Sequence, residues 1–334
     1  RKYNITFSNR ISEGAFKNTK FNFIGSRKFS YVISAIVVGV AIASLATRGL
    51  NPGIDFAGGR SYVVRFQQEV STVDIAADLR NVFGESPEVK TFGTSNQVKI
   101  TTKYKIDDES ENIDNQVDSL LHIGLANYLP ENTSLDSFIH DYKQSSMKVG
   151  PTIAHDLRQE AIIALAIALI VIFLYILIRF KNWSYGTGAV AALAHDTLIV
   201  VGIFSILYNR VPFALEIDQA FIAAILTIIG YSINDSVVIF DRIREYVGLY
   251  PKRDRLAIMN SALNDTLSRT FSTSFSTLVV LVPIFFFGGE SIRGFIFGLI
   301  IGILVGTYSS LFIASPVAYD LQLRRANKAA AKKK

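Results

Sequence analysis

Six apolar stretches, each long enough to cross the hydrocarbon core of a lipid bilayer, limit what this chain can fold into more than any other feature. A bilayer core of about 30 Å is crossed by about 20 residues of helix. The second stretch runs for 18 residues without a charge, which is too long and uniform for an ordinary core helix. The chain is therefore predicted to be a multi-pass α-helical membrane protein with six transmembrane helices, near residues 29–47, 161–178, 183–208, 220–240, 271–289 and 294–318.

Composition narrows the classes of function. Charged residues make up 19% of the chain, against roughly 25% in an average soluble protein. Cysteine is absent, which excludes disulfides and every thiolate-based metal or catalytic site. The motifs of zinc proteases, intramembrane aspartyl proteases and serine hydrolases are missing as well. We therefore expect a membrane component without enzymatic activity.

Basic residues gather on one side of the predicted spans. They lie before the first span, in the turn at 179–181, in the connection at 242–255 and in the tail at 321–334. Because cytoplasmic loops are enriched in Lys and Arg, both termini are predicted to be cytoplasmic and residues 50–150 to lie on the outer side. Such clusters report topology and contact with anionic lipid, so no nucleic-acid partner is expected.

The outer block reads as a small folded domain of mixed α and β structure. Alternating apolar residues predict strands, and a capping Ser or Thr followed by a terminal Gly predicts the first helix. The expected order is strand, helix, two strands, helix and strand, at about 60–66, 71–84, 88–93, 97–104, 110–128 and 134–142. This β-α-β-β-α-β order is typical of a ferredoxin-like domain.

Two turns join this block to the membrane part. "NPGIDFAGGR" follows the first span, and its Gly58 and Gly59 allow tight backbone geometry, while Asp55 can cap a helix or pair with Arg60. "VGPT" is the matching entry turn before the second span. Near the other side of the membrane, apolar residues interleave with charges at 242–264, which predicts an amphipathic linker at the membrane surface.

These boundaries give the predicted organisation of the chain. Its parts are a cytoplasmic segment at 1–28, a first helix at 29–49, the outer domain at 50–150, five further helices at 151–320 with a cytoplasmic loop at 242–264, and a basic cytoplasmic tail at 321–334.

The fourth span is the most informative element, because it places Asn234 and Asp235 well before the charges that end it. Asp235 precedes Asp241 by six residues, which places it roughly 9 Å inside that boundary. An ionised Asp at such depth costs about 2.5 to 3.5 kcal/mol. Polar positions of this span are expected to share one interior-facing stripe: Thr227, Tyr231, Asn234, Asp235, Asp241 and Arg242. Asp235 is interpreted either as a carboxylate that loads and releases a proton or as a helix-packing hydrogen-bond partner.

The fifth span offers a partner for this acid. Its polar positions follow one helical strip: Asp265, Arg269, Ser272, Thr273, Ser276 and Thr277. Because Arg269 keeps its proton in proteins, its predicted role is a fixed positive charge beside Asp235. The alternative is a flanking residue that snorkels to the interface.

Two further titratable residues, His195 and Asp196, lie near the middle of the third span. We expect one of them to form a hydrogen bond across to the second or fourth span. Two interpretations stay open, a structural polar clamp between helices and a place on a proton path.

Five motifs, in order, resemble the SecF family of bacterial protein export. They are "GIDFAGG" after the first span, "VGP" before the second, "AHD" in the third, "IIGYSINDSVVIFDRIRE" in the fourth and "NDTLSRT" before the fifth. The likeness covers about 21–319. It implies a membrane domain of the resistance-nodulation-division type with a small periplasmic domain, in the bacterial inner membrane.

The resemblance also implies a function and its residues. It makes Asp235 and Arg269 the proton-transfer pair, with Asn234, His195 and Asp196 as secondary candidates. The proton gradient supplies the energy and no cofactor is expected. The implied partners are SecD, the SecYEG channel with the SecA motor, the exported preprotein, YajC and YidC.

One departure from the family concerns the lead before the first span. This polar lead of 28 residues has no initiator Met. With it, the chain resembles the second half of a fused SecD-SecF polypeptide. Two other functions stay open at this point, a proton-coupled exporter of drugs or lipids with the same membrane architecture, and a passive scaffold that holds the translocon.

Overall fold

The computed structural model describes residues 19–108, 110 and 112–331. In this part of the chain six helical runs are long and apolar enough to cross a membrane, which confirms the predicted number of spans. They are α1 (Arg27–Arg48), α6 (Pro151–Phe180), α7 (Trp183–Leu207), α8 (Gln219–Leu249), α9 (Arg255–Phe287), and a last run through α10 (Glu290–Ser309), η3 (Ser310–Ala314) and α11 (Ser315–Ala331). The protein is a multi-pass membrane protein. Residues 1–18 and 332–334 of the two predicted terminal segments lie outside the described residues.

The membrane helices extend beyond the apolar stretches that predicted them. The helix α6 begins at Pro151, a residue whose fixed φ suits the first turn of a helix. At the opposite end of the bundle, α8 continues to Leu249 and α9 starts at Arg255. The prediction of an amphipathic linker at 242–264 is therefore wrong, because Ile258 and Met259 are buried in the core between these helices and not laid on a membrane surface.

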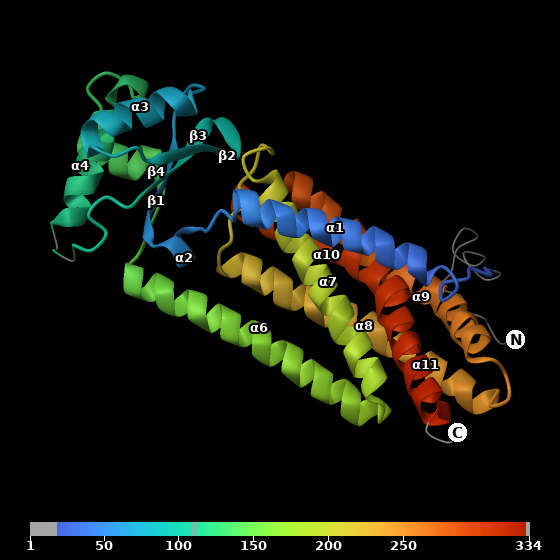
Figure 1. The fold of residues 1–334 in the computed structure, drawn as a ribbon. Helices are drawn as coiled ribbons and strands as arrows, with labels where there is room; N and C mark the ends of the chain where they lie inside the picture. Colours follow the sequence, from blue (N-terminus) through green and yellow to red (C-terminus); the bar gives the residue numbers. More distant parts are fainter. Residues whose placement is uncertain (1–18, 109, 111, 332–334) are drawn as a thin grey trace, which may run out of the picture.

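The helix α7 lies at the centre of the bundle and contacts α1, α6, α8, α10 and α11. Small residues permit the close approach of helices, as is usual in membranes. An added Cβ at Gly202 would lie 2.2 Å from Ala41 of α1, and one at Gly302 would lie 2.2 Å from Ile228 of α8. In contrast, α6 lies at the edge of the bundle, and only 6% of its apolar window is buried (Figure 1).

The outer domain follows α1 and precedes α6. Its elements are β1 (Gly59–Arg65), α3 (Thr72–Phe83), β2 (Glu88–Phe92), β3 (Thr94–Thr102), α4 (Ile113–Leu125), η1 (Ala126–Tyr128), α5 (Leu135–Ser137), η2 (Phe138–Tyr142) and β4 (Lys143–Val149). The four strands form an antiparallel sheet in the order β2-β3-β1-β4. The helices α3 and α4 pack together on the side of the sheet that faces away from the membrane helices (Figure 1).

Alternation along the strands sorts side chains to the two faces of the sheet. Tyr62 and Val64 of β1 and Ile100 of β3 are buried in the core of the outer domain. Ser61 of β1 and Lys99 of β3, one position away, line a cavity on the face toward the membrane helices. The domain thus has an apolar core on one side and a polar face toward the bundle on the other.

The last strand is not where the sequence predicted it. Residues 134–142 are helical, because the Ser134 hydroxyl accepts the Ser137 N–H as a cap and Phe138 packs fully buried in the core. The edge strand is β4, which pairs with β1 from Gly59 opposite Val149 onward. Its polar and exposed side chains hide the alternating signal that the other strands carry.

The two predicted joints lie together. A short helix, α2 (Ile54–Ala57), follows α1, and Gly58 and Gly59 then adopt φ values of +68° and +144° that side chains rarely take. Ile54 packs with Val149 and Ala154 in a small apolar cluster at the start of α6. The alternative pairing of Asp55 with Arg60 is wrong, since Arg60 is buried and pairs with Asp114 of α4.

Candidate functional site in the membrane helices

The predicted intramembrane acid lies in the interior of the bundle. Asp235 of α8 is 4% exposed, and no donor in the described part of the chain bonds to its buried Oδ2 atom. Buried polar atoms are nearly always paired, and leaving a carboxylate unpaired in an apolar region is costly. The position of Asp235 is therefore set by the fold of α8, with its Oδ2 atom unpaired among the described residues.

Arg269 of α9 acts on this carboxyl from a distance. Its positive charge interacts electrostatically with Asp235, but no ion pair joins the two among the residues that the structure describes. The guanidinium lines a cavity of about 610 Å³ between α6, α8 and α9, with Val238 and Thr266. The other arginines of this cavity are engaged in ion pairs: Arg179 and Arg244 with Asp241, and Arg242 with Glu245 and Asp265. Within the described chain, Arg269 is thus the cavity's arginine without an ion pair.

The polar stripe of α8 is divided between the interior and the outside of the bundle. Tyr231 is partly buried and Asp235 is buried, whereas Thr227 and Asn234 are exposed. The expectation of one interior-facing line is wrong, because adjacent residues of a helix point about 100° apart. On α9 the polar strip likewise turns outward at Arg269, Ser272 and Ser276. Both helices thus carry exposed polar side chains within their apolar windows.

Asp196 of α7 is the second buried carboxylate, and its bonds are all satisfied. Its Oδ1 atom lies 3.0 Å from Nδ1 of His195, while Oδ2 accepts hydrogen bonds from Ser232 of α8 at 2.8 Å and Ser309 of α10 at 2.7 Å. The predicted bond across to the fourth span is present at Ser232. Three helices therefore meet at one carboxylate that is 1% exposed.

Ser309 was missed by the sequence analysis, and so was the partnership of Ser232. The available signal was the spacing of Gly298, Gly302 and Gly306 on α10, a small-residue repeat that marks close helix packing. An added Cβ at Gly306 would lie 3.1 Å from Cβ of Ser232 and 3.6 Å from Oδ2 of Asp196. The absence of side chains here is what brings α10 close enough for Ser309 to reach Asp196.

A second set of hydroxyls connects α8, α9 and α10. Tyr231 donates to Ser274 at 3.3 Å, and Ser274 lies 2.6 Å from the Thr307 hydroxyl. Of the hydroxyl strip expected on α9, Ser272 and Ser276 are exposed and Thr273 and Thr277 are half-buried, whereas the buried hydroxyl that bonds to the neighbouring helices is that of Ser274. Among the described residues no group of three or more His, Asp or Glu could hold a metal ion.

Six membrane-crossing helices, a domain inserted between the first two, and a buried unpaired acid define a multi-pass membrane protein with a polar site inside its helix bundle. Two family profiles match the chain: "Protein export membrane protein SecD/SecF, C-terminal" over residues 131–324, and "SecD/SecF GG Motif" over residues 43–70. The chain therefore belongs to the SecD/SecF family of protein export membrane proteins.

Individual relatives refine the place of the chain in this family. Protein translocase subunit SecF of Rhodothermus marinus is 44% identical over 312 residues, covering 93% of this chain and 96% of the relative. Protein translocase subunit SecF of Haemophilus influenzae is 38% identical over 303 residues, covering 91% of this chain and 86% of the relative. The family branch is thus that of SecF.

Solved structures of SecDF share the fold. SecDF of Thermus thermophilus, a translocon-associated membrane protein, superposes with a TM-score of 0.77 at 31% identity over 91% of this chain. A super-membrane-facing form of SecDF gives a TM-score of 0.64 at 30% identity over 94% of this chain. The chain spans about two fifths of these SecDF chains, 39% and 40%.

Proposed function

We propose that this chain, a SecF-type component of protein export, uses the proton gradient across the bacterial inner membrane to help complete preprotein translocation. It acts with SecD, after the stage carried out by SecA and SecYEG. The observation that carries the proposal is Asp235, a carboxyl buried in α8 without a partner among the described residues. A carboxyl without fixed donors can exchange a proton without breaking a hydrogen-bond network first.

The proposed orientation has the outer domain in the periplasm and both termini in the cytoplasm. Basic residues at 179–181, 242–255 and 321–331 support it, since these described segments all lie at one end of the bundle (Figure 1). Arg27 at the start of α1 pairs with Asp320 of α11 at this same end, opposite the sheet (Figure 1). The outer domain is proposed to be ferredoxin-like, supported by its β-α-β-β-α-β order and its antiparallel strand order β2-β3-β1-β4.

In the proposed cycle a proton from the periplasmic side neutralises Asp235 and removes its attraction to Arg269. The two helices α8 and α9 then favour a different arrangement, and release of the proton toward the cavity at Arg269 restores the first one. One charge that crosses 100 mV supplies about 2.3 kcal/mol, so a few protons suffice to bias two arrangements of the helices.

His195 and Asp196 are assigned to a structural clamp and not to the proton path. All three bonding partners of Asp196 are themselves buried, and the carboxylate joins α7, α8 and α10. Asn234 and Arg269 are exposed on this chain and are assigned to the contact with SecD. Polar side chains in a membrane face a partner or a water-filled cavity, which supports a partner at this face.

The test replaces Asp235 with Asn in membrane vesicles that carry the full Sec machinery and this chain as their SecF. The part of preprotein export that the proton gradient stimulates should fall to background, while export driven by ATP alone persists. Asp156→Asn near the start of α6 is the control, because this carboxylate is 65% exposed, lies beside His155 on the same helix and should change little. Unchanged gradient stimulation in Asp235→Asn would contradict the proposal.

A further inference from the structure

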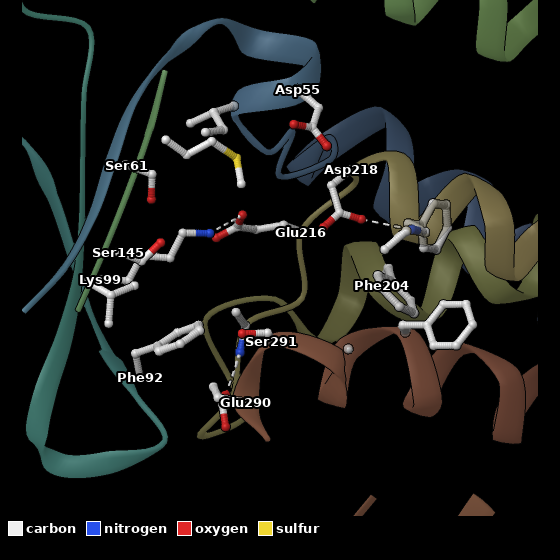
Figure 2. A pocket seen from close by; sticks show the side chains of 18 residues that line it. Asp55, Ser61, Phe92, Lys99, Ser145, Phe204, Glu216, Asp218, Glu290 and Ser291 are labelled. Carbon is white, nitrogen blue, oxygen red and sulfur yellow. Dashed lines mark hydrogen bonds and ion pairs between the residues drawn. The ribbon is translucent and has the colours of Figure 1, made fainter. Parts of the chain in front are cut away.

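The segment 214–219, which leads from α7 into α8, contacts the outer domain directly. Figure 2 shows Lys99 from the sheet reaching Glu216 of this segment, with Asp218 and Asp55 lying beyond it. A cavity of about 210 Å³ lies between the sheet and the bundle at this point. Its floor is formed by Phe204, Phe221 and Phe295 from three membrane helices, so the contact lies at the outer end of the helix bundle.

Backbone hydrogen bonds hold the segment to the chain that enters the outer domain. The N–H of Gly53 donates to the Ile217 carbonyl at 2.9 Å, and the N–H of Ile217 donates to the Asn51 carbonyl at 2.8 Å. Gly53 allows this approach, because an added Cβ there would lie 3.2 Å from Asp218 Cβ and 3.3 Å from Glu216 Oε2. The two segments thus form an isolated parallel β-bridge between Pro52 and Ile217.

Side chains add two further links. Lys99 Nζ of β3 donates to Glu216 Oε2 at 2.7 Å, with side-chain exposures of 18% and 12%. Asp55 Oδ2, next to the glycine pair, accepts the N–H of Gln219, the first residue of α8, at 3.1 Å. Such a carboxylate satisfies a backbone donor that a helix start leaves unpaired and favours its positive end. The start of α8 is therefore capped by a residue of the joint to the outer domain as well as by its own Asp218.

Lys99 is the cation that keeps three carboxylates together at this contact. Burial raises the pKa of Asp218, and the neighbouring carboxylates Asp55 and Glu216 raise it further, whereas Lys99 lowers it. Loss of the lysine would leave Asp55, Glu216 and Asp218 to repel one another across a partly buried space. Among the described residues, Lys99 thus provides the ion pair that links the sheet to the segment 214–219, beside the backbone bonds that hold this segment to residues 51–53.

The helix that receives these contacts is the helix that carries Asp235. From Gln219 to Asp235 it is continuous α-helix, about 24 Å long at 1.5 Å per residue, which transmits displacement along its axis. We propose that Asp55 and Lys99 are positioning residues that couple the orientation of the outer domain to α8, and through α8 to the state of Asp235. This inference rests on the proposed function, in which a proton at Asp235 drives a change outside the membrane.

The experiment measures the distance between the two parts in the full chain, assembled with its Sec partners in vesicles. Because the chain has no cysteine, Val73→Cys on α3 and Ile292→Cys at the start of α10 provide unique spin-label sites; both side chains are exposed. Asp235→Asn, a permanently neutral side chain, should shift the distance distribution between these labels. Lys99→Glu or Asp55→Ala should remove that shift and lower gradient-stimulated export by about fivefold or more, the usual range of coupling between sites.

Three controls separate positioning from simple loss of structure. Asp55→Asn keeps an oxygen that accepts the Gln219 N–H and should restore most of the coupling. Lys99→Glu combined with Glu216→Lys re-forms the ion pair in reverse and should rescue the single Lys99→Glu variant. Lys90→Glu removes a pair with Glu88 that lies within β2 alone and should leave distance and export unchanged.

The outcomes distinguish the two proposals. If Asp235→Asn leaves gradient-stimulated export intact, the proposed function fails. If Asp235→Asn abolishes it but shifts no distance, or if the shift survives in Lys99→Glu and Asp55→Ala, the coupling inference is overturned while the proposed function stands.

Discussion

Asp196 and Asp235 are two buried carboxylates on neighbouring helices of one bundle, and they differ in their hydrogen-bond partners. Asp196 has three bonding partners on three helices, whereas no donor in the described chain bonds to the buried Oδ2 of Asp235. A satisfied buried acid stabilises the arrangement of its donors, while an unsatisfied one costs free energy. The contrast is one of bonding, and the proposed function assigns the exchangeable proton to the acid without fixed partners in the described chain.

The largest difference in stability is expected when each of the two acids is substituted in turn. Asp196→Ala removes the carboxylate that bonds to His195, Ser232 and Ser309 from three helices and should lower the free energy of unfolding by about 2 kcal/mol or more. Asp235→Asn should change it by less than about 0.5 kcal/mol, because no donor is lost. Thermal unfolding of the purified chain in detergent measures both. Equal destabilisation by the two substitutions would remove the basis of the comparison.

A smaller effect is expected where α10 packs on α8. Gly302→Ala places a methyl group 2.2 Å from the Ile228 side chain, and overpacking of this kind costs about 1 to 3 kcal/mol. The displacement should also weaken the bond from Ser309 to Asp196, seen as faster amide hydrogen exchange in α10. Gly230→Ala on α8 is the matched control, since no atom lies within 4 Å of its added Cβ. Loss of stability in the control as great as in Gly302→Ala would show that packing is not the cause.

A third carboxylate, Asp114 of the outer domain, tests whether a bonded acid also stabilises the fold outside the membrane helices. Asp114 accepts a hydrogen bond from the buried guanidinium of Arg60, and this bond holds the pKa of Asp114 below its ordinary value. A lowered pKa in the folded state stabilises the fold above the unfolded value of about 3.9, and the gain is lost as the pH falls through the folded value. Unfolding followed by the fluorescence of the outer-domain tyrosines should show this loss of stability at acid pH. Asp114→Asn should flatten the profile below pH 4, and an unchanged profile would contradict the assignment.

The smallest effect is expected from one donor of the Asp196 cluster. Ser232→Ala removes a single hydrogen bond, and such bonds in membrane proteins contribute about 0.6 kcal/mol on average. Ser276→Ala, an exposed serine that bonds only to the Ser272 carbonyl of its own helix, provides the control. A change above about 2 kcal/mol in Ser232→Ala would indicate that Asp196 depends on this bond and that the cluster is less redundant than its three bonds suggest.

Much of the candidate site was predictable, because its residues violate the rule of apolar spans. Asp235, His195 and Asp196 stand out in apolar sequence, and Arg269 stands out beside it. Arg269 interacts with Asp235 electrostatically, but no ion pair joins the two among the described residues; Asp235 is buried and Arg269 is exposed. The roles of these residues remain predictions.

The amino-acid sequence by itself determined the six membrane helices, the β-α-β-β-α-β order of the domain between the first two, and the presence of an acid within the fourth of these helices. These are local properties, set by the length of apolar runs and by the periods of helix and strand. Only the tertiary structure decided that Ser232 and Ser309 bond to Asp196, that Asn234 faces outward, and that Asp55 caps α8 from the outer domain. Periodicity determines which residues share a face, but the partner of that face depends on packing between segments 36 to 164 residues apart.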